Sequence, residues 1–151
     1  MKTIEKNAYH DLKLSEFLCF AVYSTNLAFG KAYAPLLKQL GLTYTQYITI
    51  VALWEEDNQT VSSLGEKLFL ESNTLTPILK KLEAMSYLKR QRDPADERLV
   101  RVRLSESGRQ LRERRSETGL IGATGLALDE FKGLQEQIVE LRTSLIRSMT
   151  I

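Results

Sequence analysis

Residues 61–104 place two different hydrophobic periodicities side by side, and this combination most constrains the fold. Between residues 72 and 84 the apolar side chains recur at spacings of three and four, which is the stripe of an amphipathic helix packed on a core. Residues 99–104 alternate apolar and basic side chains, as a half-buried strand does, and residues 88–92 can pair with them. A shorter helix is predicted from Val61. This order predicts a mainly α fold with a small β-hairpin wing, a winged helix-turn-helix.

The polar face of the helix over residues 72–84 has the composition of a DNA-reading surface. Its side chains are Ser72, Asn73, Thr74, Thr76, Lys80 and Lys81, with Pro77 among them. When a helix N-terminus enters a major groove, short hydrogen-bonding side chains approach base edges and cations one turn later flank phosphates. A surface helix with solvated lysines would have a similar face. Ser72 or Thr74 can cap the helix, and we favour Ser72 with an irregular first turn, in which Pro77 removes one early hydrogen bond.

Basic charge is concentrated in the predicted wing. Residues 80–103 contain eight Lys or Arg and four Asp or Glu, whereas the whole chain has a net charge of only +2. Residues 93–98 are turn formers that predict an exposed tip. We expect Arg92 to contact phosphate and Arg98 to reach the minor groove, with Asp96 orienting Arg98 through a charged hydrogen bond. A charge run is often only a solvated face, but its place after a helix pair favours binding to double-stranded DNA.

Length and composition fit one compact globular chain. The 151 residues are 43% hydrophobic and 26% charged, and no apolar run approaches the about 20 residues that cross a bilayer. The N-terminus lacks the apolar core of a signal peptide, so we expect a cytoplasmic protein without membrane contact. One cysteine and one histidine, His10, exclude an intrachain disulfide and leave too few ligands for a Cys-based zinc site, so no metal or cofactor is expected.

The two ends of the chain predict long helices outside the DNA-reading region. A helix from Leu14 has a broad apolar face and ends between Gly30 and Pro35, before a linking segment. The last helix begins near Asp129 and carries a heptad stripe made of Phe131, Leu134, Ile138, Leu141 and Leu145. These faces could pack on the chain's own core, but neither has an obvious partner of sufficient size. We therefore expect a homodimer that reads a pseudo-palindromic operator.

This organisation divides the chain into three parts. Residues 1–44 contain the N-terminal helix and link, residues 45–108 the winged helix-turn-helix, and residues 109–151 the C-terminal helices. We expect the first and last parts to form the dimer interface and the middle part to bind DNA. The three parts belong to a single compact chain.

These residues resemble the MarR family of winged-helix repressors and, within it, the organic hydroperoxide-sensing, OhrR-type branch. The family likeness rests on Asp96-Glu97-Arg98 in the wing, followed by Leu104-Ser105-Glu106-Ser107-Gly108. The branch likeness rests on Leu18-Cys19-Phe20 with Tyr23, on Leu42-Thr43-Tyr44, and on Thr74-Leu75-Thr76-Pro77. The resemblance covers nearly the whole chain and implies a homodimeric DNA-binding repressor, not an enzyme.

The resemblance implies that Cys19 senses organic hydroperoxide. In this branch, tyrosine hydroxyls matching Tyr33 and Tyr44 reach from the other subunit to hold the thiolate, and Tyr23 lies on the same strip of helix as Cys19. Tyr33 is 14 residues from Cys19, about 21 Å along a straight helix, which agrees with a contact across a dimer. Hydrogen bonds from the hydroxyls favour the thiolate, which is the form that attacks a peroxide O–O bond.

The chain departs from the two-cysteine members of that branch. Gly122, Thr124 and Leu126 occupy the region after the wing where those members carry a resolving cysteine. Oxidised Cys19 would therefore stop at sulfenic acid, form a mixed disulfide with a small cellular thiol, or overoxidise. The chain resembles a one-cysteine sensor.

The residues also allow three other functions. A small aromatic or phenolic ligand could release a MarR-type repressor, with Cys19 packing only as a small hydrophobe. Cys19 could be the nucleophile of a thiol peroxidase, although no histidine or arginine accompanies it in the first helix. The winged helix could bind protein instead of DNA, which the basic charge of residues 80–103 makes less favourable.

Overall fold

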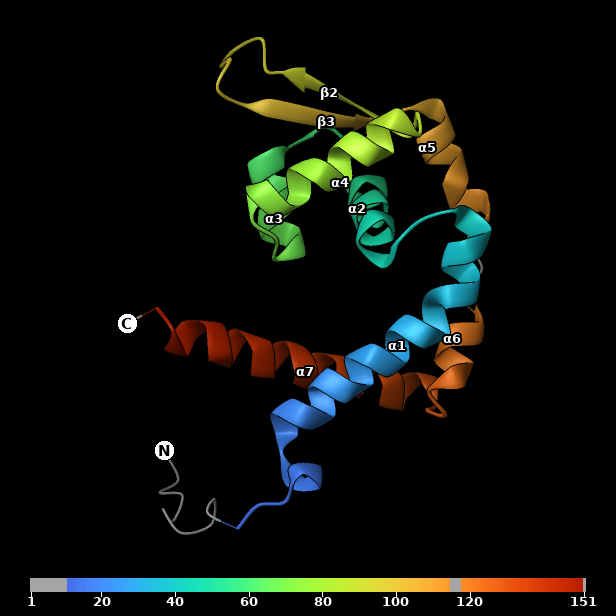
Figure 1. Ribbon diagram of the computed structural model, residues 1–151, viewed down its shortest axis with the longest axis vertical. Coiled ribbons are helices and arrows are strands. Elements are labelled where there is room, and N and C mark those ends of the chain that lie inside the picture. The colour runs from blue at the N-terminus through green and yellow to red at the C-terminus, as the bar shows by residue number, and fades with distance from the viewer. Residues whose placement is uncertain (1–10, 115–117, 151) are drawn as a thin grey trace. The chain divides into compact units, whose positions relative to one another are not determined.

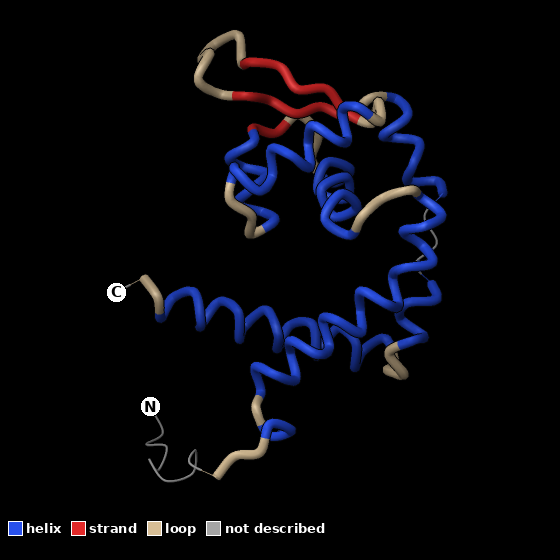
Figure 2. The backbone as a smooth tube through the Cα atoms, viewed as in Figure 1, coloured by secondary structure: helices blue, strands red, loops and turns tan. Residues whose placement is uncertain are grey.

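The computed structural model describes residues 11–114 and 118–150. Contacts divide the chain into two units, Met1–Arg114 and Arg115–Ile151, which are described separately. The first unit is mainly helical with an antiparallel sheet, and the second is helical (Figure 1, Figure 2). This confirms the predicted fold class, a mainly helical winged helix-turn-helix with long N- and C-terminal helices. His10 lies outside the described residues.

The N-terminal helix α1 (Leu18–Leu40) is longer than predicted. The predicted end between Gly30 and Pro35 is wrong, because the helix continues through both residues. Leu36 and Leu40 are buried, so packing of the last turns outweighs the hydrogen bond that the proline removes. The helix ends where the next residue, a glycine, has a φ of 69°, the left-handed conformation that closes many helices. The predicted start at Leu14 is instead a separate 3-10 turn, Leu14–Glu16.

Three helices form the core of the predicted winged helix-turn-helix. They are α2 (Tyr44–Glu55), α3 (Val61–Leu68) and α4 (Ser72–Ala84). Hydroxyl oxygens cap the first two: Thr43 accepts from the Gln46 N–H at 3.3 Å, and Thr60 accepts from the Ser63 N–H at 3.1 Å. The fully buried leucines between these helices include three members of the predicted α4 stripe, Leu75, Leu79 and Leu82.

The wing is a three-stranded antiparallel sheet in the order β1-β3-β2. Strands β2 (Leu88–Arg92) and β3 (Val100–Leu104) form the predicted hairpin, with Leu88 opposite Leu104. The sequence did not predict β1 (Gln59–Thr60), because two residues between helices are too few to show a strand period. This short strand covers the second edge of β3. After the wing come α5 (Glu106–Gln110) and a 3-10 turn, Leu111–Arg114.

The second unit contains α6 (Thr118–Ala123) and α7 (Leu128–Ser148). The turn between them includes Gly125, whose φ of 71° favours glycine. The predicted heptad stripe lies on α7 and is largely uncovered, since Leu134, Ile138 and Leu145 are 43% to 56% exposed. None of the described helices is long and apolar enough to span a membrane.

Candidate nucleic-acid interface and sensor cysteine

The first turn of α4 presents the predicted base-reading side chains at the surface. Ser72, Asn73 and Thr74 are exposed, and Thr76 is half-buried. The prediction that Ser72 is the N-cap is wrong, because α4 already begins at Ser72 and Glu71 is the N-cap. The Glu71 backbone is extended, and its carbonyl accepts hydrogen bonds from the N–H groups of Thr74 and Leu75 at 3.0 and 2.9 Å. Helical hydrogen bonding therefore starts one residue earlier than the hydroxyl side chains suggested.

The start of α4 also departs from a regular helix. The Thr76 hydroxyl donates to the Ser72 carbonyl at 2.7 Å, so its oxygen remains available as an acceptor. Pro77, inside the helix, has no N–H to donate to the Asn73 carbonyl. This turn therefore offers both backbone and side-chain hydrogen-bonding groups at the surface. The two lysines one turn further along, Lys80 and Lys81, are exposed.

Arg98 lies at the wing tip and is oriented by Asp96, as predicted. Its Nε and Nη2 donate to different Asp96 carboxylate oxygens, both at 2.9 Å, and its backbone N–H donates to Oδ1 at 3.1 Å. These bonds from the side chain and backbone of Arg98 hold the pKa of Asp96 below its usual value. The Arg98 side chain is 89% exposed, so its remaining donors are accessible to a ligand.

The α4 turn and the wing tip share one surface. Ser72, Thr76 and Arg98 line a hollow of about 220 Å³ between α3, α4 and the wing. Ser62 of α3 and Arg90 of β2 line it as well, and neither was predicted as a site residue. Hydroxyl and guanidinium groups of this kind are the usual partners of nucleic-acid phosphates and base edges. The structure thus joins residues from both predicted halves of the interface.

A buried carboxylate fixes the rest of the wing. Asp93 is 7% exposed; its Oδ2 accepts from Arg101 Nε at 2.5 Å and its Oδ1 from the Ala95 N–H at 2.8 Å. The bond from Arg101, followed by the one from Ala95, lowers the pKa of Asp93 from its usual value. Arg92, predicted to contact phosphate, donates Nη1 to the Glu97 carbonyl at 2.7 Å and so also supports the tip.

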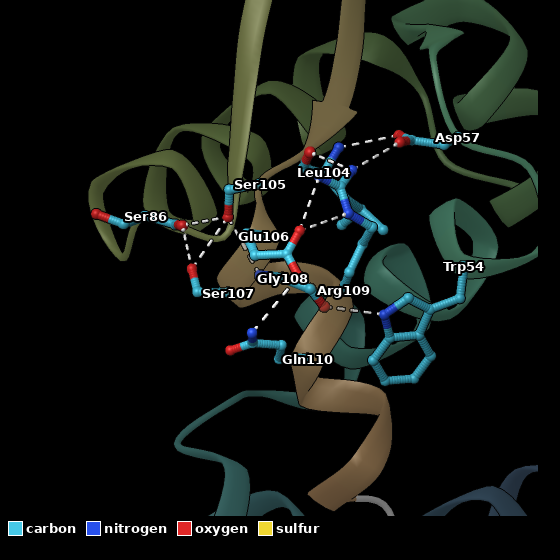
Figure 3. A network of polar contacts seen from close by, with 10 residues as sticks. All are labelled: Trp54, Asp57, Ser86, Leu104, Ser105, Glu106, Ser107, Gly108, Arg109 and Gln110. Carbon is cyan, nitrogen blue, oxygen red and sulfur yellow. Dashed lines mark hydrogen bonds and ion pairs between the residues drawn. The ribbon is translucent and has the colours of Figure 1, made fainter.

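The Leu104–Gly108 segment closes the base of the wing (Figure 3). The Ser105 hydroxyl donates to the Ser86 carbonyl at 2.5 Å and accepts from the Gly108 N–H at 3.1 Å, and the Ser107 hydroxyl donates to the same carbonyl at 2.7 Å. A Cβ on Gly108 would collide with the Tyr87 carbonyl oxygen, so only glycine fits there. This motif therefore holds the α4–β2 turn against α5.

The end of α2 is tied to the same base. Trp54 Nε1 donates to the Gly108 carbonyl at 2.9 Å, and the Leu104 N–H donates to Asp57 Oδ1 at 2.9 Å (Figure 3). Asp57 Oδ2 also lies 3.6 Å from Arg109 Nη1. Sequence reasoning missed these connections, because the bonded residues are 54 and 47 positions apart. No local spacing signals contacts of that range.

Cys19 is exposed in the first turn of α1, and Tyr23 is exposed one turn later. Tyr33 lies on the same continuous helix, about 21 Å further along, so Cys19 cannot reach Tyr33 of its own chain. Tyr33 instead contacts Tyr44 of α2, with ring centroids 5.3 Å apart in an edge-on arrangement. The structure brings together the two tyrosines that the resemblance assigned to one thiolate. Among the described residues, no group of His, Cys, Asp and Glu side chains could hold a metal ion.

Known proteins resemble this chain in sequence over most of its length. A family model described as transcriptional regulator SarA/Rot matches residues 31–115. The HTH-type transcriptional regulator TtmR of Methylorubrum extorquens (strain PA1) is 43% identical over 134 residues, which is 87% of this chain and 69% of the relative. The organic hydroperoxide resistance transcriptional regulator of Bacillus subtilis (strain 168) is 38% identical over 140 residues, 93% of this chain and 92% of the relative.

Solved structures agree with the sequence relatives. Reduced AbfR bound to DNA, from the AbfR regulator of Staphylococcus epidermidis, is 34% identical, covers 90% of this chain and 94% of its own, and has a TM-score of 0.73. These relatives are transcriptional regulators, not enzymes, which argues against the thiol peroxidase alternative. The predicted resemblance is confirmed: this one-cysteine chain belongs to the MarR/SarA family of winged helix-turn-helix, DNA-binding transcriptional regulators.

Proposed function

We propose that this protein is a homodimeric repressor that binds operator DNA while Cys19 is reduced and releases it when an organic peroxide oxidises Cys19. The observation that carries the proposal is the exposed thiol at one end of α1, on a helix that holds it about 21 Å from the Tyr33–Tyr44 pair. Two relatives support it. The Bacillus subtilis regulator is named for organic hydroperoxide resistance, and AbfR was solved reduced on DNA.

Exposed apolar side chains along the part of α1 around Cys19 support a dimer. Side chains on this part of α1 are 36% to 62% exposed, namely Leu18, Phe20, Val22, Leu27 and Phe29. Exposed apolar residues gathered on one helix are typical of a protein interface. In a two-fold dimer with the α1 helices antiparallel, Cys19 of each subunit meets the Tyr33–Tyr44 pair of the partner subunit. The uncovered α7 stripe supports a second part of the same interface.

The proposed chemistry starts from the Cys19 thiolate. Its sulfur attacks one peroxide oxygen, the O–O bond breaks, and the alkoxide leaves and takes a proton to become an alcohol, which leaves a sulfenic acid on Cys19. A small cellular thiol then condenses with the sulfenic acid to form a mixed disulfide and water. Overoxidised AbfR was also solved on DNA, which favours the bulkier mixed disulfide as the adduct that releases DNA.

The proposed DNA contacts come from α4 and the wing. We assign the base edges to Ser72, Asn73, Thr74 and Thr76. Phosphates are assigned to Lys80, Lys81 and Arg92, and the minor groove is assigned to Arg98. Pro77 shapes the first turn. An adduct on Cys19 displaces the partner's tyrosine pair and so changes the spacing of the two reading heads, which have to match half-sites about 34 Å apart.

Cys19→Ser tests the sensor role. Fluorescence anisotropy measures the affinity for a duplex selected by the reduced protein, before and after treatment with cumene hydroperoxide and free cysteine. Wild-type protein is expected to lose at least about tenfold in affinity, whereas C19S binds equally in both conditions. Intact mass identifies the adduct. An unchanged peroxide response in C19S would overturn the sensor role and favour release by an aromatic or phenolic ligand.

A further inference from the structure

A row of aromatic rings leads from the proposed sensor tyrosines toward the base of the wing. Tyr33 of α1 contacts both Tyr44 and Tyr47 of α2, with ring centroids 5.3 and 6.2 Å apart. Tyr47 contacts Trp54 in turn, with centroids 6.3 Å apart in an edge-on arrangement. Tyr47 is only 2% exposed, so it fills the interior between the two ends of the row.

Helix α2 makes the row a rigid unit. Tyr44, Tyr47 and Trp54 follow one another at steps of three and seven residues, which places them on one face of the helix over about 15 Å. Close-packed side chains transmit a displacement because the interior has few voids that could absorb it. A shift of Tyr33 or Tyr44 therefore reaches the far end of α2.

That far end is bonded to the wing. Trp54 Nε1 donates to the Gly108 carbonyl at 2.9 Å, and Gly108 is itself held by Ser105 (Figure 3). Asp57, just after α2, accepts from the N–H of Leu104, the last residue of β3, at 2.9 Å. A movement of α2 along or around its axis consequently moves the base of the wing.

We infer that Tyr47 and Trp54 are positioning residues that transmit the state of the Tyr33–Tyr44 pair to the wing. The inference rests on the proposed function and names the route within one subunit by which oxidation reaches the DNA-reading surface. When an adduct on Cys19 of the partner subunit displaces the tyrosine pair, Tyr47 follows and the bond from Trp54 carries the movement to Gly108. The wing tip then leaves the position from which Arg98 reaches DNA.

Trp54→Phe and Tyr47→Leu test this route in the full-length protein. W54F keeps an aromatic ring but removes the N–H that donates to Gly108, and Y47L interrupts the row. Thr49→Val is the matched control. Thr49 is a fully buried α2 residue on the face opposite the row, and its hydroxyl donates to the Thr45 carbonyl at 2.7 Å. Thermal unfolding compares the stability of all three variants.

The main readout is the release ratio, the Kd for the selected duplex after cumene hydroperoxide and cysteine divided by the Kd before. The ratio is expected to fall about fivefold in W54F, the equivalent of one hydrogen bond, and to stay at the wild-type value in T49V. Trp54 is the single tryptophan of the chain, so its fluorescence reports directly on the end of the row. Oxidation is expected to shift its emission in wild type and T49V but not in Y47L, although intact mass shows the same adduct.

The outcomes separate this inference from the proposed function. If wild-type protein releases DNA on oxidation and W54F releases it with the same ratio, the inference is overturned while the sensor role stands. W54F decides this even if Y47L fails to fold. If oxidised wild-type protein keeps its DNA, the proposed function fails. The route is then supported if Trp54 emission still responds to the adduct, and it is overturned if the emission does not change.

Discussion

Carboxylates hold two arginines of the wing in fixed orientations. Asp96 binds Arg98 in a fork at the tip, and the buried Asp93 binds Arg101 below it. Charged hydrogen bonds of this kind fix geometry as well as charge. The sequence predicted the first pair because its members are two residues apart in a turn. It did not predict the second, because its members lie eight residues apart across the hairpin and pair only in the observed register.

Arg98→Ala is expected to weaken DNA binding about tenfold, because the exposed guanidinium is the proposed minor-groove contact. The slope of the logarithm of the binding constant against the logarithm of the salt concentration should also become less negative by about 0.9. The variant has one positive charge fewer at the DNA, so fewer counterions are released on binding. Anisotropy titrations at several salt concentrations measure both quantities. Arg112→Ala, which removes an exposed arginine outside the wing, is the control. Equal losses in the two variants would contradict a specific contact.

Asp93→Asn is expected to lower the thermal midpoint at pH 7. The folded state lowers the pKa of Asp93, chiefly through the hydrogen bond from Arg101. A carboxylate whose pKa is lowered by folding stabilises the fold at every pH above its pKa in the unfolded chain, which is about 4. That contribution disappears as the pH falls through the lower pKa of the folded state. Thermal melts of wild type and D93N should therefore differ at pH 7 and converge below about pH 4. A constant difference across this range would count against the ion pair.

The helices and strands show most clearly which features local sequence patterns predict and which they do not. The apolar stripe of α4 and the alternation of β3 were predictable because each repeats over several residues. The end of α1 was not, since burial of Leu36 and Leu40 outweighs the local stop signal of Pro35. Strand β1 was also not predictable, because its conformation depends on pairing with β3, whose residues are far away in sequence. The α4 side of the candidate site was thus predictable, and its connection to α2 was not.

Pro77→Ala is expected to stabilise the protein by about 1 to 3 kcal/mol, because alanine restores the N–H that the Asn73 carbonyl lacks inside α4. Differential scanning calorimetry should show a higher thermal midpoint. Part of the gain is offset because alanine leaves the unfolded chain freer than proline does. A lower midpoint would show that the rest of the unit requires the irregular first turn.

The whole molecule combines a winged helix-turn-helix with long helices that have apolar side chains not covered by the rest of the chain. Apolar side chains are exposed along α1 in the first unit and along α7 in the second. The sequence predicted this correctly, because a heptad stripe without a core to cover it indicates a partner helix. How these surfaces pair in the proposed dimer could not be predicted, since amphipathic periodicity gives the face of a helix but not its partner.

Ile138→Glu is expected to dissociate the dimer, because it places a charge in the apolar stripe of α7. Sedimentation equilibrium should give a dimer for wild type and a monomer for I138E at micromolar concentration. Gln137→Glu adds the same charge to a neighbouring exposed position outside the stripe and should remain dimeric. An I138E protein that stays dimeric would contradict the role of α7.

The length of α1 has a genetic consequence. In the proposed dimer, each complete sensor draws its thiol from one polypeptide and its phenol from the other, because one helix carries Cys19 and Tyr33 too far apart to meet. Two alleles, one without the thiol and one without the phenol, are then each expected to be inactive alone and to restore a working sensor when they are expressed together. Half of the sites in such a mixed dimer are complete, so the two defects complement each other instead of adding.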